Sequence, residues 1–556
     1  MRPGHPNAGA AVVALSLWAL PGGALLCPAR QADGQTIAFA QVSRTAASPA
    51  GTVLGQSLLA GRYLVGTRLV IAELDNVTKT ARVIAAEFAC ATDPAFDHDG
   101  RRLVFAGQRR SEDPLQIWEV LIPGLEPRQI VVCGADCVDP AYLGNGGVVF
   151  ASLLPQEYEE HGGRFSLSLY ASEPGTNAPH RITFNPSSDF APTVLPDGRV
   201  LYSSWQHVGD RAWPFGVVAL MLVNSDGTGV FPLTGNHRGP WLKRGGVVFN
   251  GDRVAFVQSE QFAEFGAGEL VFTSLNDPFG PYAPLRTEQP YEVSDAASLP
   301  GGGLVLSARP AADKAATFGL YVYQAGQVRL LYDDPDYHEL SPAVGGARAR
   351  PELRISTVVP ETPYGYLAIL NCYDSNRGDV QGLSQGQVAS VRVLAGSPRR
   401  HPEGWHPTSA PKRRGYVEPG DRDATSGGLA TRILGEVPPA ADGSVYLKVP
   451  ADRPLRIQLV GGDGYSLINE RAWFWVRPNE RRVCIGCHED RERAPVNRVP
   501  EATRQAPVDL TDPRGWETVS FRRAIQPMVG KNGAVPNGHE SAPSSAGMIL
   551  GTARGE

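Results

Sequence analysis

The sequence has few charged residues and no excess of basic ones. Charged residues make up 20% of the 556 residues, and 52 Lys and Arg against 57 Asp and Glu leave a formal net charge of −5. A protein that binds nucleic acid usually presents a strongly basic face. This charge balance argues against a nucleic-acid partner.

Long apolar segments are missing from almost the whole chain. The exception is Ala10–Leu26, which Pro-Gly-Gly interrupts and which is short for a membrane span. An apolar run of this kind behind a basic residue is typical of a secretory signal. We predict a signal peptide over residues 1–30 and a mature protein that is periplasmic or otherwise extracytoplasmic.

Cys27 directly follows the apolar run, so the signal also has a lipoprotein interpretation in which Cys27 carries a lipid anchor. Bacterial lipoprotein signals usually have a small residue before that cysteine, whereas this chain has Leu26. Simple cleavage nearby is therefore favoured. Membrane contact is predicted only through such an anchor.

Methionine is rare as well, with 4 residues, whereas Gly (62) and Pro (47) are abundant. This composition favours a turn-rich architecture of strands over a helical one. A chain of this length exceeds one ordinary hydrophobic core, so two or three domains are expected.

Cysteine is used sparingly, but two of the seven cysteines form the motif Cys484-Ile485-Gly486-Cys487-His488. Two thiols at this spacing can add to the vinyl groups of a haem, and the adjacent histidine then binds the iron. A zinc site would need a second ligand pair, and a thioredoxin-like dithiol would need a βαβ context. The motif predicts one covalent haem c, attached through Cys484 and Cys487, with His488 as an axial ligand.

The sequence leaves the second axial ligand of the iron open. An empty position would allow ligand chemistry, whereas a filled one favours electron transfer. His401 and His406 rank first, because their loop precedes the haem motif. The other candidates are His207, His338 and Met528.

Four cysteines belong neither to the signal nor to the haem motif. In an oxidising compartment such residues form disulfides or fill apolar sites in a core, and both alternatives stay open. They are Cys90, Cys133, Cys137 and Cys372.

The middle of the chain repeats a phrase. Asp93–Phe96 is followed by an Asp-Gly turn and the apolar segment Arg101–Ala106, and related phrases begin near residues 139, 191, 239, 295 and 341. Each unit has the pattern of a strand, a hairpin turn and a second strand, often with a third and fourth strand. Four strands at this period are typical of a propeller blade.

The repeat therefore predicts a mainly β chain with a six-bladed β-propeller over residues 36–355. Each Asp-Gly turn is expected to join the two innermost strands of a blade. Thr67–Ile84 is expected to supply outer strands that close the ring.

Ionisable and thiol side chains recur at the predicted inner strands, where successive blades converge. Such a ring could bind a metal or a cationic ligand. Because Asp before Pro is common in turns, turn chemistry and disulfides are the favoured explanation. The residues are Cys90, Asp93, Cys137, Asp139, Asp189, His237, Asp295, His338 and Glu339.

The repeat stops after about residue 355. Residues 398–427 have the composition of a loop, residues 435–460 alternate between apolar and polar, and residues 473–476 predict a further strand. We predict a small β-sandwich-like domain over residues 356–482 and a c-type haem segment over residues 483–510.

Several strings resemble one known family. Val476–Glu489, which contains the haem motif, and Ile433–Pro438 resemble the C-terminal half of proteins related to the hydrazine synthase alpha subunit. Tyr202–His207 and Asn224–Gly229 in the predicted propeller resemble the same family. The resemblance implies an exported protein with a six-bladed propeller, flanking β domains and c-type haem. It also implies partners, either other subunits of a redox complex or a partner cytochrome.

Two departures from that family weigh against hydrazine synthesis by this chain alone. Residues 520–528 resemble the opening of a cytochrome c-like domain, but residues 532–537 lack both cysteines of the second haem motif that relatives have there. We interpret residues 511–556 as the start of a degenerate or truncated cytochrome c-like domain. Residues 489–493 also lack the tyrosine that the active alpha subunit has shortly after its haem motif.

Two functions remain open from the sequence. One is that of a haem-dependent oxidoreductase component, which transfers electrons or performs redox chemistry on a small nitrogen-containing ligand together with a partner. The alternative is a propeller-based binding or scaffold module of a periplasmic complex with a structural haem. A hydrolase-like propeller is disfavoured, because no nucleophile–base motif is found.

Overall fold

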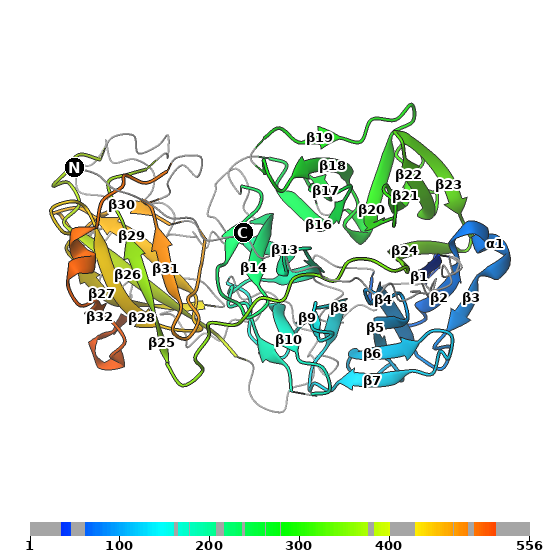
Figure 1. Ribbon diagram of the computed structural model, residues 1–556, viewed down its shortest axis with the longest axis horizontal. Helices are drawn as coiled ribbons and strands as arrows, with labels where there is room; N and C mark the ends of the chain where they lie inside the picture. Colours follow the sequence, from blue (N-terminus) through cyan, green and yellow to red (C-terminus); the bar gives the residue numbers. More distant parts are fainter. Residues whose placement is uncertain are drawn as a thin grey trace, which may run out of the picture. The chain divides into compact units, whose positions relative to one another are not determined.

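The computed structural model is dominated by β-strands, as the composition predicts (Figure 1). No helix among the described residues is long and apolar enough to cross a membrane. The predicted signal over residues 1–30, with Cys27, lies outside the described residues. These are residues 35–45, 62–160, 165–176, 178–206, 216–235, 239–261, 263–278, 280–375, 383–400, 429–470, 472–487 and 494–518.

The repeat region forms five sheets: four are antiparallel, and the remaining one is a double sheet. The first has the order β24-β1-β2-β3, with β1 (Thr36–Ser43), β2 (Arg68–Glu73), β3 (Arg82–Ile84) and β24 (Tyr337–Val344). The second contains β4 (Cys90–Phe96), β5 (Arg102–Gln108), β6 (Gln116–Leu121) and β7 (Arg128–Val131). The third contains β8 (Cys137–Tyr142), β9 (Val148–Ser152), β10 (Ser168–Ser172) and β11 (His180–Arg181).

The double sheet is two four-stranded units joined by a single parallel pair, Val218 with Leu242. Its first unit contains β12 (Asp189–Val194), β13 (Arg199–Gln206), β14 (Val217–Asn224) and β15 (Phe231–Pro232). Its second contains β16 (Leu242–Phe249), β17 (Arg253–Ser259), β18 (Glu269–Ser274) and β19 (Ala283–Pro284). The last sheet contains β20 (Tyr291–Ser298), β21 (Leu304–Pro310), β22 (Gly319–Gln324) and β23 (Gln327–Tyr332).

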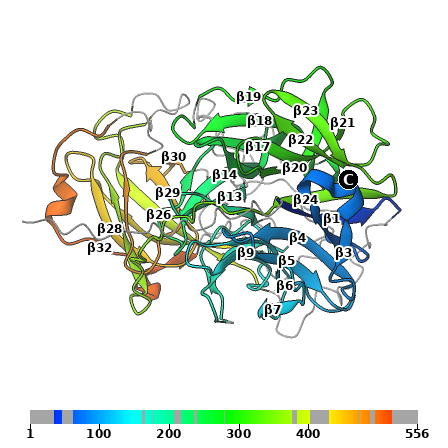
Figure 2. The ribbon, with the colours of Figure 1, turned by 45° about the vertical axis from the view of Figure 1, so that its right-hand side comes forward.

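The first strands of these units contact one another in cyclic order. Strand β4 contacts β8, and the series continues through β12, β16, β20 and β24 back to β4. We call these six strands the inner ring. Figure 1 shows most of them around a common centre with the later strands of each unit farther out, and Figure 2 shows β4, β20 and β24 from a second direction. The arrangement is propeller-like.

The start and the end of the repeat region meet in one sheet. Strand β24 pairs antiparallel with β1, for example Ile37 with Val344 and Gln41 with Glu339. Strand β1 then pairs with β2, and β2 with β3, so residues 68–84 form the outer part of this sheet. Because the last unit takes strands from both ends, unfolding at either end would expose the core beneath it.

The Asp-Gly turns connect the first two strands of their units. Asp97 stabilises one such turn: its Oδ1 accepts hydrogen bonds from the backbone N–H of Arg101 and Arg102 at 2.8 and 3.1 Å. Gly100 follows with φ of 68°, and a Cβ there would lie 2.7 Å from the backbone nitrogen of Gly346. The turn needs glycine for its backbone angle and for the close passage of the chain.

The Asp-Pro phrases are not turns, which corrects the interpretation drawn from their composition. Asp93 and Asp139 lie inside β4 and β8 with φ of 50° and 52°, at shifts of register against the second strand. Ala191 and Ser341 occupy the corresponding places in β12 and β24, with φ of 50° and 49°. These are β-bulges, which re-aim side chains within a strand.

Residues 364–518 contribute two further sheets. One has the order β31-β25-β28-β32, and the other the order β30-β29-β26-β27-β33. Residues of both, such as Leu367 and Leu447 in the first and Val391 and Leu455 in the second, share one apolar core. The strands are β25 (Tyr364–Ile369), β26 (Ser390–Pro398), β27 (Leu429–Val437), β28 (Val445–Pro450), β29 (Leu455–Val460), β30 (Ser466–Asn469), β31 (Arg481–Cys484), β32 (Val508–Asp509) and β33 (Glu517–Thr518).

The strand predicted over residues 473–476 is absent. Phe474 makes one isolated bridge to Leu455, and Trp475 is 1% exposed within the core of the repeat region rather than that of the two C-terminal sheets. Its indole Nε1 donates to the carbonyl oxygen of Gly227 at 2.9 Å. The segment departs from strand geometry because the large aromatic surface is buried in a neighbouring core.

Trp475 should therefore contribute strongly to stability. Trp475→Phe keeps an aromatic ring but loses the donor to Gly227, and we expect it to lower the free energy of unfolding by about 1 kcal/mol. Trp475→Ala should lower it by about 3–5 kcal/mol, because a buried ring is lost and a cavity remains. Denaturant unfolding measures both values, and a wild-type value for Trp475→Ala would contradict this packing.

Candidate haem attachment site

The two cysteines of the motif lie at the end of an edge strand. Cys484 is the last residue of β31, which runs parallel to β25 and places Cys484 opposite Ile369. Cys484 is half-buried, whereas Cys487 is 5% exposed and belongs to the core between the two C-terminal sheets. Neither cysteine is part of a disulfide.

The segment that follows β25 holds the turn between the two cysteines through backbone hydrogen bonds. The N–H of Leu370 donates to the carbonyl of Cys484 at 2.9 Å, and the N–H of Asn371 donates to Ile485 at 3.1 Å. In return, the N–H of Cys487 donates to the carbonyl of Asp374 at 2.9 Å. Residues 370–374 therefore bind the turn along its whole length, and we call this segment the clamp.

Gly486 is the position where the clamp and the turn come closest. A Cβ at this residue would lie 2.2 Å from the carbonyl oxygen of Asp374, far inside contact distance. Backbone cannot give way here without breaking the Cys487–Asp374 hydrogen bond. The glycine of the motif is thus required by packing against residues outside the motif.

Cys372 lies in the clamp but differs chemically from the motif cysteines. It is fully buried, and its N–H donates to the carbonyl of Gly443 at 2.8 Å. Burial raises the pKa of Cys372 to about 12. The thiol therefore stays protonated near neutral pH and fills an apolar site.

The residues just before β31 connect the motif to the repeat region. The Oε1 of Glu480 accepts a hydrogen bond from the N–H of Gly229 at 2.8 Å, and its Oε2 accepts one from the N–H of Arg477 at 2.7 Å. Together with the bond from Trp475 to Gly227, this carboxylate fixes the turn between β14 and β15 to the segment that leads into Cys484. We call these contacts the junction.

Known proteins resemble this chain in sequence and in fold. A model of the hydrazine synthase alpha subunit middle domain matches residues 386–489, a range that ends just beyond the haem motif. A curated relative, hydrazine synthase subunit alpha of Kuenenia stuttgartiensis, is 25% identical over 517 residues, which cover 76% of this chain and 62% of the relative. The chain is related to the hydrazine synthase alpha subunit.

A solved structure of Kuenenia stuttgartiensis hydrazine synthase has a similar fold. The match has a TM-score of 0.74 at 22% identity, and it covers 89% of this chain and 80% of that chain. At this identity the match establishes the fold and not the chemistry. The chain also spans less than two thirds of the length of the curated relative that it matches.

Two of the sequence segments that resemble hydrazine synthase alpha relatives are in contact in the folded structure. Asn224–Gly229 from the repeat region and Val476–Cys484 from the C-terminal region face each other across the junction. A Cβ at Gly227 would lie 2.5 Å from the carbonyl of Ile182 and 3.0 Å from the side chain of Arg477. Sequence reasoning found both strings but not their contact.

The motif supplies the two thiols that covalent attachment of a haem requires. They stand at the two ends of one short turn, which three backbone hydrogen bonds hold against the clamp, with Cys484 half-buried and Cys487 5% exposed. His488, the predicted axial ligand, lies outside the described residues. So do four of the candidates for the other axial position, His207, His401, His406 and Met528.

His338, the remaining candidate, is a packing residue of the inner ring. It is 8% exposed in β24, and its Nδ1 accepts a hydrogen bond from the N–H of Phe318 at 3.2 Å. Its ring lies 5.0 Å from that of Phe265 and 5.9 Å from that of Phe318. Burial lowers the pKa of His338, so the neutral imidazole serves the packing between two units.

The predicted ring of ionisable residues is present, but its members do not gather as metal ligands. Among the described residues, no group of three or more His, Cys, Asp or Glu side chains is arranged to hold a metal ion. His237 lies outside those residues. Cys90, Cys133, Cys137 and Cys372 form no disulfide, and Cys90, Cys137 and Cys372 are buried in apolar surroundings.

The aspartates of the ring instead tie neighbouring strands together. The Oδ2 of Asp93 accepts from the N–H of Asp139 at 3.4 Å, and the Oδ2 of Asp139 accepts from the N–H of Ala191 at 2.9 Å. Farther round, the Oδ2 of Asp295 accepts from the N–H of Ser341 at 3.3 Å, and the Oγ of Ser341 donates to Asp93 at 2.9 Å. Each carboxylate thus links the bulge of one unit to the next.

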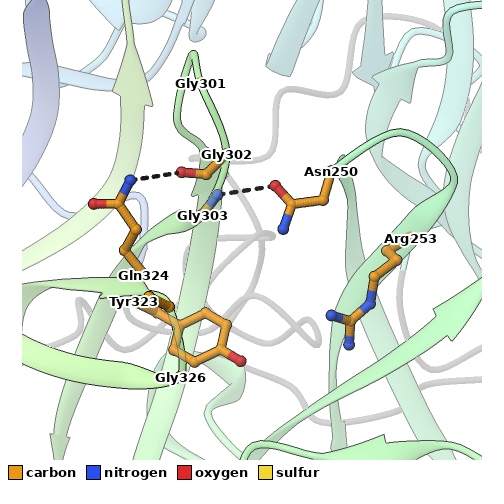
Figure 3. A pocket seen from close by; sticks show the side chains of 9 residues that line it. Asn250, Arg253, Gly301, Gly302, Gly303, Tyr323, Gln324 and Gly326 are labelled. Atoms are coloured by element: carbon orange, nitrogen blue, oxygen red, sulfur yellow. Dashed lines mark hydrogen bonds between the residues drawn. The ribbon is translucent and has the colours of Figure 1, made fainter.

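A separate cleft of about 320 Å³ lies between β17 and the turn that precedes β21 (Figure 3). Asn250 accepts a hydrogen bond from the N–H of Gly303 at 3.1 Å, and Gln324 donates to the carbonyl of Gly302 at 3.3 Å. The cleft contains none of the residues that the sequence predicts to bind haem or metal.

The contact between Gly486 and the clamp leads to a test on the haem-free protein. Gly486→Ala should push the turn away from Asp374 and expose Cys487, so an uncharged alkylating reagent should label Cys487 several times faster than in the wild type. Gly462→Ala is the matched control, because a Cβ at Gly462 meets nothing within 4 Å. Peptide mass spectrometry reports the labelling, and equal rates in both variants would refute the close contact.

Asp139, one of the ring aspartates, makes stability depend on pH. Burial and the neighbouring Asp93 raise the pKa of Asp139 to about 7 from an ordinary value of 3.8. Between these values the folded chain keeps a proton that the unfolded chain releases, so the free energy of unfolding should fall as pH rises from about 4 to 7. At 1.36 kcal/mol for each pH unit, the fall is at most about 4 kcal/mol.

Asp139→Asn should remove this part of the pH dependence, as denaturant unfolding between pH 4 and 8 would show. The ionisable groups that face Asp139 include Asp93, Arg62, Tyr63 and Arg244, and they remain in the variant. Asp99→Asn, in an exposed turn, is the control and should keep the wild-type slope. An unchanged slope in Asp139→Asn would contradict the buried, proton-holding carboxyl.

Proposed function

We propose that this chain is an exported c-type haem protein in which Cys484 and Cys487 hold one haem and His488 binds its iron. The observation that carries the proposal is the C-x-x-C-H motif at the end of β31, with its turn fixed by the clamp. Covalent haem attachment in bacteria takes place outside the cytoplasm, which agrees with the predicted signal. When bound, such a haem supplies one-electron transfer and a site for small ligands.

The residues of this chain have separable roles in the proposal. The parallel pairing of β31 with β25 sets the direction in which Cys484 leaves the sheet. The clamp fixes the backbone between the two cysteines, which lowers the conformational entropy lost on attachment. The Glu480 carboxylate then holds this unit against the repeat region.

We further infer that the six four-stranded units are the blades of a six-bladed propeller. The cyclic contacts of the inner ring and the pairing of β1 with β24 support this inference. In that arrangement the propeller contacts the segment before the haem motif through the junction. Residues 356–482 form the sandwich-like connection, and residues 483–510 contain the haem segment.

The proposed activity is electron transfer, or redox chemistry on a small nitrogen-containing ligand, together with a partner. The relationship to a subunit of hydrazine synthase supports other subunits or a partner cytochrome as that partner. One haem passes one electron at a time, so a multi-electron reaction would require further redox centres.

A scaffold role with a structural haem is the second candidate. The junction favours it, because Trp475 and Glu480 couple the haem segment firmly to the repeat region. The two candidates differ in one observable. An electron-transfer haem should cycle between ferric and ferrous forms with small reductants and with a partner, whereas a purely structural haem need not exchange electrons with any partner.

Haem attachment is tested by intact-protein mass spectrometry on the full chain from a cytochrome-maturing host. The wild type should carry one haem, and the Cys484→Ala, Cys487→Ala double variant should carry none. Cys372→Ala is the matched control, because this buried thiol lies in the clamp but outside the motif, and it should keep its haem. An unmodified wild-type mass would overturn the proposal.

A further inference from the structure

The centre of the inner ring is filled by two residues that belong to no strand. Arg62 and Tyr63 precede β2 and are 4% and 9% exposed. Their side chains contact three inner-ring strands whose residues are far away in the sequence. The repeat itself does not supply them, since the phrase that recurs in each unit begins only at Asp93.

The guanidinium of Arg62 is bonded through all three of its nitrogens. Nη2 lies 2.6 Å from each carboxylate oxygen of Asp295 and also donates to the carbonyl of Ser294 at 3.4 Å. Nε and Nη2 donate to the carbonyl of Phe265 at 3.3 and 3.2 Å. Nη1 donates to the Oγ of Ser341 at 3.2 Å. One carboxylate, two carbonyls and one hydroxyl thus converge on a single planar cation.

Tyr63 extends these contacts to the opposite part of the ring. Its hydroxyl donates to Oδ1 of Asp139 in β8 at 3.2 Å. The dipeptide therefore connects β8 with β20 and β24, and the bond from Ser341 to Asp93 adds β4. Four of the six inner strands meet through this one insertion.

A second arginine shows that the acceptors at this centre suit guanidinium groups. Arg244, from β16, also donates through Nη2 to the carbonyls of Phe265, at 2.6 Å, and of Ser294. Its Nε donates to the carbonyl of Gly266 at 2.7 Å, and its Nη1 lies 3.8 Å from Asp295. Two planar cations therefore use the same carbonyls and the same carboxylate.

The charges at the centre support this pattern. Burial acts to raise the pKa of Asp295, yet Arg62 and Arg244 together hold it below its usual value. Burial and the nearby Arg62 lower the pKa of Arg244 to about 10. Asp295 is thus an ionised acceptor, and the two arginines repel each other across it. Arg62 is the member that the chain brings in from outside the ring.

We propose that the centre of the inner ring is a binding site for a guanidinium group, which this chain fills with its own Arg62. The site consists of the Asp295 carboxylate, the Phe265 and Ser294 carbonyls and the Ser341 hydroxyl. Its acceptors bind Nε, Nη1 and Nη2 of Arg62, and the same carbonyls and carboxylate bind Arg244, which matches the several donors of a guanidinium and not the compact charge of an ammonium. The class of ligand that the site takes is therefore a guanidinium compound.

Chemical rescue tests the proposal on the full-length protein. Arg62→Ala removes the cation and leaves Asp295 without its closest partner, so the temperature of unfolding should fall by several degrees. Guanidinium chloride in the low millimolar range should then raise that temperature in a saturable manner, whereas potassium chloride at equal ionic strength should not. Wild type and Arg350→Ala, which removes a surface ion pair with Asp99, should show no such rise.

A second variant keeps the test decisive if Arg62→Ala folds poorly. Arg62→Lys retains the positive charge but not the fork, and it should be less stable than the wild type and respond little to guanidinium. For a poorly folding Arg62→Ala, the yield of soluble protein on refolding with and without guanidinium gives the same comparison. The absence of a guanidinium-specific gain in Arg62→Ala, or a wild-type stability of Arg62→Lys, would overturn the proposal.

Discussion

The parallel pairing of β31 with β25 is the interaction on which the candidate haem site depends. Register places Cys484 beside Ile369, and the chain beyond β25 then continues alongside the motif as the clamp. Backbone groups supply all three hydrogen bonds of this contact, so it tolerates many side chains but not a change in the path of the chain. Gly486 is the exception, because its hydrogen atom faces the Asp374 carbonyl.

The junction and the inner ring both satisfy backbone N–H and C=O groups where strand pairing ends, but they do so with different side chains. At the junction, a buried indole and a carboxylate bind the backbone of a turn between β14 and β15, which joins two cores without a continuous sheet. In the ring, aspartates at bulges bind the backbone of the next strand. Both use side chains to satisfy N–H and C=O groups where strand pairing ends, as buried polar groups require.

Local signals in the sequence predicted much of the β architecture. Asp-Gly turns and apolar strands such as Arg102–Gln108 are set by residues close together in the chain, so the hairpins could be predicted. The Asp93 and Asp139 bulges could not, because the positive φ of an aspartate is imposed by partners about fifty residues away. The strand predicted over residues 473–476 is absent for the same reason: the apolar run fits a strand, but the partner of Trp475 is Gly227.

For the candidate site, the sequence identified the motif cysteines and not their supports. Cys484 and Cys487 are recognisable because their chemistry depends on spacing alone. The clamp carries no motif, since it acts through its backbone, and Arg62 belongs to no repeat. Such contacts become visible only when distant segments are placed together. The resemblance to hydrazine synthase alpha relatives pointed to the right strings, and the structure shows that two of them touch.

The central claim is that the turn between Cys484 and Cys487 carries a covalent haem. The most direct measurement is peptide mapping of the full chain from a cytochrome-maturing host, with tandem mass spectrometry of the peptide that spans residues 483–487. We expect this peptide, and no peptide containing Cys90, Cys133, Cys137 or Cys372, to carry the mass of one haem through both cysteines. An unmodified or disulfide-linked Cys484–Cys487 peptide, or a haem on any other cysteine, would contradict it.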